Sequence, residues 1–413
     1  MIFKARLPVE FALLLPRSMR HWVTALVALI AAITYALGNA SQVLAGGAAS
    51  TGFVTVAPRA ILMDAASGAI LYQKNADDLA PPASMSKLMT LAVLFKAMKD
   101  GQIKASDEFV MSVNAWRKGG APSGTSAMFV PVNTKARVDE LIRGIAIQSG
   151  NDAAIAVAEG MSGSEANFAK LMTDEARRIG LEKSTFANAT GLDSPQHLMT
   201  VRELALLARH LIVQYPDQYP VFAEREFLYR KHKFFNRNPL LSAGIGVDGL
   251  KTGHTKDSGF GLVASAVRDG RRLIAVLSGA ESETQRKNDA TKLLEWGFTA
   301  ISDVKIFDDA EIIGHARVWG GQSMYVPLTG KGDVTIALPK LPTNQRLSAE
   351  IVYIAPLKPP VKRGDQVATL RVTSTSSASS EIPLYAAEDV EPAGTVRRGL
   401  DSLMLMALRR LAL

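Results

Sequence analysis

The spacing of apolar positions changes several times along the chain, and each spacing predicts a different element. Residues 59–75 contain two short alternating runs on either side of Ala66-Ser67-Gly68, which is the pattern of a β-hairpin. Residues 246–280 alternate in the same way, and Asp269-Gly270 signals a tight turn between two strands. Between these regions apolar residues recur three and four positions apart, which predicts helices in four segments: 83–95, 138–161, 165–180 and 200–215.

Three further features complete this part of the chain. Residues 116–131 are rich in Gly, Ser and Pro and are expected to form a loop. The helical pattern of 138–161 is interrupted by Ser149-Gly150-Asn151; because glycine costs about 1 kcal/mol in a helix interior, this break is either a defect or a functional feature. A last helix is expected near Gln285–Thr299. Strands, then helices, then strands predict an α+β domain over residues 53–303, with an antiparallel sheet, a helical layer and a helical subdomain.

The helical spacing stops after about Val304. Short alternating runs follow, separated by Gly, Pro, Asp and Asn, which predicts a small all-β domain over residues 304–388. The polar run from Thr373 to Ser380 is expected to be an exposed hairpin or a linker.

The N-terminal region has the order of a secretory signal peptide. Arg17 and Arg20 precede an uncharged apolar run from Trp22 to Leu37, and small residues follow as far as Ala45. The run has 16 residues, whereas a membrane span needs about 20. We therefore expect residues 1–45 to be a cleaved signal peptide. Cleavage at Ala40, a start at Met19 and an uncleaved anchor remain alternatives.

The C-terminal segment 395–413 is predicted to be an imperfect amphipathic helix, because Leu405 falls on its polar side. Its net charge of +3 is too high for a membrane span and suits the interface of an anionic membrane. A helix docked on the β-domain and a dimer contact are the alternatives. The apolar side consists of Val396, Leu400, Leu403, Met404, Ala407 and Leu411. The polar side carries Arg398, Asp401, Ser402 and Arg409.

Composition removes several classes of function. The 413 residues include no cysteine, which excludes thiolate catalysis and cysteine metal sites. The six histidines do not have the spacing of metal ligands, so we expect no metal site and no cofactor. The net charge of +8 is not gathered into basic tracts, and a nucleic-acid partner is not expected.

Three short motifs carry candidate chemistry. Ser84-Met85-Ser86-Lys87 is S-x-x-K at the start of a helix, Ser149-Gly150-Asn151 is S-x-N in the helical break, and Lys251-Thr252-Gly253 is K-T-G on a strand. Each alone is a weak signal, because a capping serine, a helix defect and a surface lysine would explain them separately. Their order and structural setting make the combination a strong one.

The residue types fit one reaction. A serine hydroxyl needs a base, and a lysine serves when burial or neighbouring cations lower its pKa. Ser84 is thus the expected nucleophile and Lys87 its base. Ser149 can relay a proton to the leaving group. The substrate-binding candidates are Asn151 for the peptide bond, Lys251 and Thr252 for an anionic terminus, Gly253 for room at the strand edge, and the N–H groups of Ser84 and His254 for the oxyanion.

From about residue 53 to its end the chain resembles the serine-type D-alanyl-D-alanine carboxypeptidases, the low-molecular-mass penicillin-binding proteins. Beyond the three motifs, the resemblance includes IQSGNDA, TFANATGL, NRNPLL, VDGLKTGHT, GFGLVASAV and LLEWGF. It implies a β-lactamase/transpeptidase-like sheet, a small β-rich domain and an amphipathic C-terminal helix. It also implies that Arg286 binds the substrate carboxylate and that Arg237 supports it.

The same resemblance implies an activity, and the expected signal peptide and C-terminal helix imply a location. The expected reaction removes the last D-alanine from peptidoglycan stem peptides through an acyl-enzyme, with β-lactams as inhibitors. The chain is expected to be exported and held at the outer, periplasmic face of the cytoplasmic membrane. A β-lactamase and a non-catalytic wall-scaffold protein are the alternative functions. A β-lactamase would need E-x-x-L-N, and Glu203 comes closest, but Leu207 stands where asparagine is required.

Overall fold

The computed structural model describes residues 2–7, 53–339, 347–374 and 379–411 and divides the chain into two units. One unit is Phe53–Ile301, and the other contains the residues from Ser302 onward together with the N-terminal strand. Most of the expected signal peptide, residues 8–45, lies outside the described residues.

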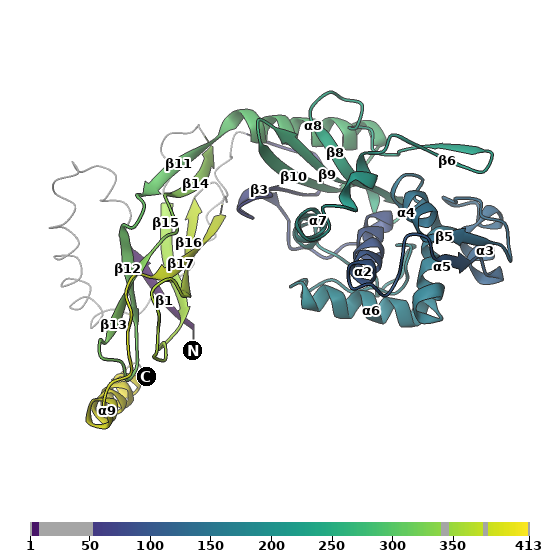
Figure 1. Cartoon of the computed structure of the whole chain (residues 1–413). Helices are drawn as coiled ribbons and strands as arrows, with labels where there is room; N and C mark the ends of the chain where they lie inside the picture. Colours follow the sequence, from purple (N-terminus) through teal and green to yellow (C-terminus); the bar gives the residue numbers. More distant parts are fainter. Residues whose placement is uncertain (1, 8–52, 340–346, 375–378, 412–413) are drawn as a thin grey trace. The chain divides into compact units, whose positions relative to one another are not determined.

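The first unit is built on five antiparallel strands in the order β3-β2-β10-β9-β8 (Figure 1). Both predicted hairpins are present: β2 and β3 pair around the 66–68 turn, and β9 and β10 pair around Asp269-Gly270. β8 carries the K-T-G motif at the end of this order, so no strand of the described residues pairs with its outer edge. The strands are β2 Arg59–Asp64, β3 Ile70–Lys74, β8 Val247–Thr255, β9 Gly259–Arg268 and β10 Arg271–Ala280.

Helices cover both faces of this sheet. α8 (Glu283–Ala300) lies on one face, and α7 (Val201–Gln214) and α2 (Lys87–Lys99) lie on the other (Figure 1). Ten of the 13 residues of α2 are buried, which explains why its sequence is apolar on nearly every side. Three further helices of this unit pack around α2 as the predicted helical subdomain: α4 Val138–Ala146, α5 Asn151–Ser162 and α6 Glu165–Arg178.

The prediction of a loop over residues 116–131 is wrong for residues 116–119, which are helical. Residues Val113–Gly119 form the short helix α3, because the Ser112 side chain accepts a hydrogen bond from the Ala115 N–H and caps it. A single 3-10 turn, Ala121–Ser123, follows before the irregular segment. Two small two-stranded sheets were also not predicted: β4 (Glu108–Val110) pairs with β5 (Lys135–Arg137), and β6 (Glu226–Tyr229) pairs with β7 (His232–Phe235).

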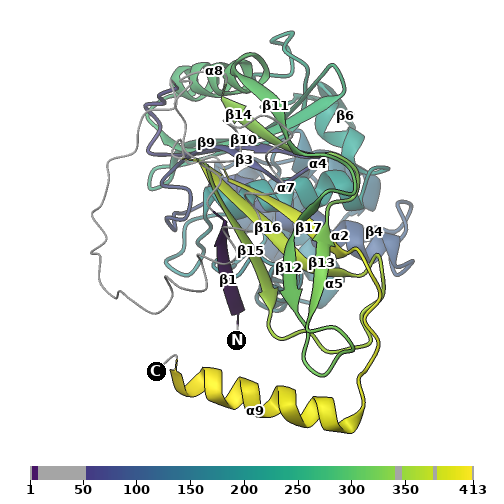
Figure 2. The ribbon, with the colours of Figure 1, turned by 90° about the vertical axis from the view of Figure 1, so that its left-hand side faces the viewer.

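The second unit is the predicted β-rich domain, followed by helix α9 (Thr395–Leu411) (Figure 2). Its strands pair in the order β1-β15-β16-β17-β13-β12, and β11 pairs with β14. β1 (Ile2–Leu7) pairs in antiparallel register with β15, and the sequence pattern did not predict a strand there. The other strands are β11 Ile301–Phe307, β12 Ile312–Arg317, β13 Tyr325–Thr329, β14 Val334–Pro339, β15 Leu347–Ile354, β16 Gln366–Ser374 and β17 Ser379–Ala386.

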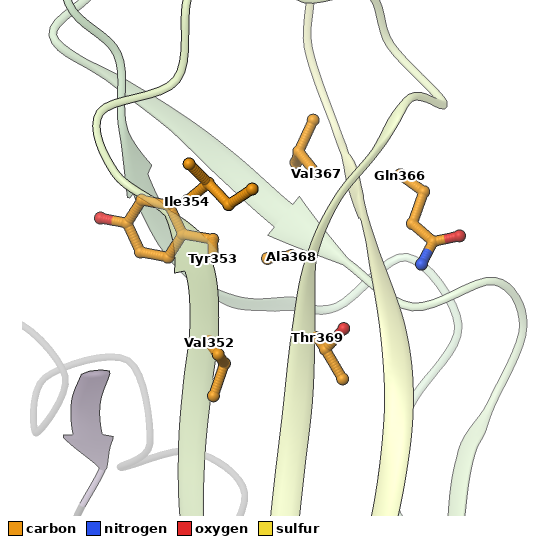
Figure 3. Close-up of a pocket in the computed structure, with 7 residues that line it drawn as sticks. All are labelled: Val352, Tyr353, Ile354, Gln366, Val367, Ala368 and Thr369. Atoms are coloured by element: carbon orange, nitrogen blue, oxygen red, sulfur yellow. The ribbon is translucent and has the colours of Figure 1, made fainter. Parts of the chain in front are cut away.

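This unit has its own apolar core, formed by the inward residues of the alternating strands, such as Ile351 and Leu370. A shallow hollow of about 310 Å³ lies over β15 and β16 (Figure 3). Its lining contains no acid, base or predicted site residue: Val352, Tyr353, Ile354, Gln366, Val367, Ala368 and Thr369. The observed architecture, an α+β unit and an all-β unit with a C-terminal helix, confirms the predicted fold class.

Candidate active site

Ser84 and Lys87 lie on one turn at the start of the central helix. Residues Ala83–Ser86 form a 3-10 turn that runs directly into α2, which begins at Lys87. Lys87 Nζ donates a hydrogen bond to Ser84 Oγ at 2.8 Å. Two more bonds go from Nζ to Asn151 Oδ1 and to the Thr190 carbonyl, both at 2.6 Å. The lysine therefore joins three segments that are far apart in sequence.

Lys87 is fully buried, at 0% exposure. The alternative in which it carries its charge to the surface is therefore wrong, and Ser84 makes no capping bond at the helix start. Burial lowers the pKa of Lys87 well below its usual value, and the positive charges of Lys251 and Arg237 lower it further. Together these effects favour the neutral amine, which is the form that can accept a proton.

The S-x-N motif occupies the break between two helices, as predicted. α4 ends at Ala146 and α5 begins at Asn151, with Ser149 in the left-handed region at φ 65°. The Asn151 amide donates to Thr125 Oγ1 at 2.9 Å while its oxygen accepts from Lys87. Ser149 Oγ is buried and has no hydrogen-bond partner among the described residues. A strained backbone and an unpaired hydroxyl at one residue are typical of a functional position.

Asp152 fixes the loop that faces this break. It is fully buried, and its carboxylate accepts hydrogen bonds from the backbone N–H groups of Met128 at 2.7 Å and Val130 at 3.3 Å. Burial raises the pKa of the Asp152 carboxyl, although the backbone bonds oppose that rise. By holding this loop, Asp152 supports the segment that carries Thr125, the partner of Asn151.

The K-T-G motif lies on β8 beside the nucleophile turn. Lys251 is 2% exposed, and its Nζ donates to the Thr252 carbonyl at 3.1 Å. Burial, with the charges of Arg237 and Arg286, lowers the pKa of Lys251 to about 7. A Cβ atom on Gly253 would lie 2.9 Å from the Pro82 carbonyl oxygen. This glycine therefore lets β8 approach the nucleophile turn, whereas the sequence analysis assigned the space to substrate.

The remaining candidates extend from this strand to α8. Arg286 is buried in the first turn of α8, 3.6 Å from Glu283, and its guanidinium lies over the Phe260 ring. The His254 ring stacks on the same Phe260 ring, and the two ring centroids are 3.9 Å apart. Arg237 is exposed, yet its charge acts on both active-site lysines. The cations Lys251, Arg237 and Arg286 therefore form one positive region.

Most of the predicted site residues interact with one another, and Ser149 is the exception. Hydrogen bonds unite Ser84, Lys87 and Asn151, and electrostatic effects connect Lys251, Arg237 and Arg286 to them. No hydrogen bond within the described residues joins Ser149 to the others. Across the parts of the chain that the structure describes, no group of three or more His, Asp or Glu is placed to hold a metal ion.

Comparison with known proteins shows the family. A family profile described as D-alanyl-D-alanine carboxypeptidase matches residues 48–282, which is more than half of the chain. The chain belongs to this family. A second profile, the C-terminal domain of penicillin-binding protein 5, matches residues 302–392. The family and the enzyme class predicted from the three motifs are confirmed.

Relatives of this carboxypeptidase family match more than half of the chain. The D-alanyl-D-alanine carboxypeptidase DacC of Escherichia coli is 39% identical over 351 residues, covering 84% of this chain and 87% of its own. The crystal structure of penicillin-binding protein 5 from Haemophilus influenzae is 33% identical, covers 83% of this chain and 100% of its own, and has a TM-score of 0.69. Penicillin-binding protein D2 of Listeria monocytogenes, solved with ampicillin bound, is 29% identical, covers 59% of this chain and 98% of its own, and has a TM-score of 0.54.

Glu203, the nearest candidate for the deacylating glutamate of a β-lactamase, has a structural role in this carboxypeptidase. It is 6% exposed in the first turn of α7, where Oε1 accepts from the Lys183 N–H at 2.7 Å and Oε2 from the Ser184 N–H at 2.6 Å. Its own N–H is capped by Thr200 Oγ1. A carboxylate held by two backbone donors fastens α7 to a loop, and this removes the one residue that favoured the β-lactamase alternative.

Proposed function

We propose that this carboxypeptidase cleaves stem peptides ending in D-Ala-D-Ala through an acyl-enzyme on Ser84, with Lys87 as general base. Ser84 Oγ attacks the carbonyl of the D-Ala–D-Ala bond, the last D-alanine leaves, and water then hydrolyses the ester. β-Lactams acylate the same oxygen, as the ampicillin-bound relative suggests, and leave it slowly. Release of D-alanine from a peptide ending in D-Ala-D-Ala tests the activity directly.

The observation that carries this proposal is the arrangement of acceptors around Lys87. A neutral amine has two N–H bonds and one lone pair. Asn151 Oδ1 and the Thr190 carbonyl can accept both N–H bonds, each at 2.6 Å. The lone pair is then directed at the third neighbour, Ser84 Oγ at 2.8 Å, and can take its proton. The surroundings thus select both the charge state and the orientation of the base.

The same geometry supports roles for the other motif residues. Ser149 lies two residues before Asn151, its buried hydroxyl has no hydrogen-bond partner among the described residues, and it passes a proton to the departing amine. Asn151 orients Lys87 and, on release from Thr125, offers its amide to the substrate peptide bond. The N–H groups of Ser84 and His254 stabilise the oxyanion, and each such donor is worth a few kcal/mol, about 2.7–4, in comparable sites.

The free carboxylate of the substrate is bound by Lys251, Thr252, Arg286 and Arg237. A carboxypeptidase must prefer a chain end, and several cations around one anion supply that preference. Burial and, after it, the charges of Arg237 and Arg286 lower the pKa of Lys251, and a bound carboxylate would raise this pKa again. Thr252, 7% exposed on the same edge strand, adds a hydroxyl donor.

Replacing Arg286 by alanine should therefore discriminate between substrates. We expect kcat/KM for a peptide ending in D-Ala-D-Ala to fall about 100-fold, because truncating one member of a buried charge pair commonly costs 2–5 kcal/mol. The corresponding peptide with a C-terminal amide has no carboxylate for Arg286 to bind, so kcat/KM for the amide should change little. Lys287→Ala, which removes the neighbouring exposed cation on α8, is the control. Equal losses on the acid and the amide would contradict the assigned role.

The structure of α9 motivates a second part of the proposal, that this helix holds the enzyme at a membrane surface. Asp401 is 6% exposed, and its carboxylate accepts a hydrogen bond from the Gly320 N–H at 2.8 Å. The opposite side presents Val396, Leu400 and Leu403, which are 80%, 63% and 65% exposed. The helix is therefore attached to the β-rich unit by its polar side and offers its apolar side outward. Helices of the described residues include none that is long and apolar enough to cross a bilayer.

This arrangement suits an interfacial helix rather than a span. The basic residues of α9 favour anionic lipid headgroups, each contributing about 1 kcal/mol near the surface. With the expected signal peptide, the enzyme would be exported and would act from the outer face of the cytoplasmic membrane, on the periplasmic side. Docking on the β-rich unit through Asp401 and binding a membrane through the apolar side are compatible.

Two neighbouring substitutions test the membrane contact with the same change of charge. Leu403→Glu places a carboxylate on the exposed apolar side, and Ser402→Glu places one on the adjacent position of the polar side. We expect co-sedimentation with phosphatidylglycerol vesicles to be lost for Leu403→Glu and for a chain ending at residue 394, and largely kept for Ser402→Glu. All three should hydrolyse a soluble peptide normally. If Leu403→Glu co-sediments with the vesicles as fully as the unchanged protein, the apolar side of α9 does not bind the membrane and the proposal is refuted.

A further inference from the structure

The segment 186–191 binds the first turn and a half of the nucleophile helix through its backbone. The Thr190 carbonyl accepts from Lys87 Nζ at 2.6 Å, and the preceding carbonyl, that of Ala189, accepts from Thr90 Oγ1 at 2.7 Å. Two successive carbonyls of one segment are thus fixed against α2. This segment carries the TFANATGL pattern, whose residues were not among the predicted site residues.

The turn within this segment is held by its own asparagine and glycine. Asn188 Oδ1 accepts from the N–H groups of Thr190 and Gly191, at 3.0 and 2.8 Å. Gly191 has φ +80°, and a Cβ atom there would lie 1.9 Å from the Ala83 carbonyl oxygen, so only glycine fits this close approach. These contacts fix the conformation of the turn after residue 188. The position of the turn relative to α2 also depends on the residues that precede it.

His197 holds the entry to this turn. The side chain is 1% exposed, its ring packs edge-to-face on Phe186, and Nδ1 accepts a hydrogen bond from the Ala187 N–H at 3.4 Å. Because Nδ1 is the acceptor, the neutral ring carries its proton on Nε2. Nε2 is buried and has no hydrogen-bond partner among the described residues. A buried, unpaired donor costs roughly 1–3 kcal/mol, so packing alone would favour an apolar residue of similar size.

The charge state of His197 is tied to the active site. Burial and the charge of Lys87 lower the pKa of His197 to about 4, and Lys87 is the charged group that acts on it among the described residues. The imidazole is therefore neutral at neutral pH, and the tautomer that accepts from Ala187 is maintained. A cationic ring would lose this acceptor and would place a second charge near the base.

We infer that His197 is a positioning residue for the general base. Through Ala187 it sets the backbone so that the Thr190 carbonyl receives one N–H of Lys87 and the lone pair stays on Ser84. This inference rests on the proposed role of Lys87. His197 contacts neither the nucleophile nor the substrate groups in the structure, so its loss should affect the acylation step and not the initial binding.

The test is the acylation of the full-length protein by a fluorescent penicillin, measured by stopped flow at several concentrations. This separates the dissociation constant of the first complex from the rate constant of acylation. For His197→Leu we expect that rate constant to fall about 10- to 100-fold, as for small displacements of a catalytic group, with the dissociation constant unchanged. His197→Asn, whose Oδ1 can replace Nδ1 as acceptor, should restore most of the rate.

His210 provides the matched control. It lies within α7, its Nε2 is also buried without a hydrogen-bond partner among the described residues, and burial also lowers its pKa. No hydrogen bond of the described residues joins its side chain to the 186–191 segment. His210→Leu should leave both constants unchanged. If His197→Leu does not fold, Thr90→Val removes the second attachment of the segment and should lower the acylation rate constant in the same selective way.

The outcomes separate this inference from the proposed function. If the unchanged protein is not acylated at all, the proposed function fails. The positioning role is overturned if the unchanged protein is acylated and His197→Leu has the same acylation rate constant or changes only the dissociation constant. It is also overturned if His197→Asn loses as much of the acylation rate constant as His197→Leu. A loss confined to the acylation rate constant, with rescue by Asn, supports it.

Discussion

Replacing Ser84 by alanine is expected to abolish both D-alanine release and covalent labelling by penicillin. Ser84 Oγ is the atom that the proposed mechanism acylates, and it lies 2.8 Å from Nζ of Lys87, the proposed base. The loss should reach the background of the assay, because removing a catalytic nucleophile commonly costs about 10⁶-fold in kcat. Labelling with a fluorescent penicillin and a coupled assay for free D-alanine measure the two losses separately.

Ser86 supplies the control for that variant. It lies two residues further along the same turn, is fully buried, and has an Oγ without a hydrogen-bond partner among the described residues. Ser86→Ala removes the same atoms from the same turn without touching the proposed nucleophile, so most of the activity should remain. Labelling of Ser84→Ala, or loss of labelling in Ser86→Ala alone, would place the nucleophile elsewhere.

Replacing Lys87 by methionine should have the second largest effect. Methionine is unbranched and apolar, so it can occupy the buried space of the lysine stem, but it cannot take a proton. We expect acylation to slow by about 10³-fold, within the range of 10²–10⁴ for general-base catalysis. The melting temperature should fall, because the buried Asn151 Oδ1 and the Thr190 carbonyl lose the donor that they share, at a cost of about 1–3 kcal/mol for each buried acceptor left unpaired. A variant that is still acylated at close to the original rate would exclude Lys87 as the base.

The pH profile provides an independent test of the base. Activity requires the neutral amine, so kcat/KM should rise with pH as Lys87 loses its proton. It should fall again as Lys251, with a pKa of about 7 in the free enzyme, loses the charge that binds the carboxylate. The positive charge of Arg237 lowers both pKa values. Arg237→Gln should therefore move both limbs to higher pH, whereas a shift of neither limb would contradict the electrostatic account.

The motif residues could be predicted from sequence because each depends on a local pattern. S-x-x-K needs only one helical turn, and the S-x-N break appears as a glycine inside an apolar helical repeat. The groups that support them could not be predicted in this way. The Thr190 carbonyl acts through its backbone, 103 residues from Lys87, and Asp152 acts on backbone N–H groups 22 and 24 residues away. Such bonds depend on tertiary packing and leave no periodic signal.

The same distinction applies to the fold. Both long hairpins, the central helices and the β-rich domain follow from apolar periods that are sustained over many residues. α3 was missed because a serine cap, and not periodicity, starts it. His197 was visible as one of six histidines, but nothing in the sequence indicated that a loop attached to Lys87 would enclose it.

The most direct test of the account is the mass of the intact protein after incubation with benzylpenicillin, followed by tandem mass spectrometry of the labelled peptide. The account predicts one covalent penicilloyl group per chain, attached to Ser84, and none when Ser84 is alanine. An adduct on any other residue, or an unmodified chain that nevertheless releases D-alanine, would contradict it.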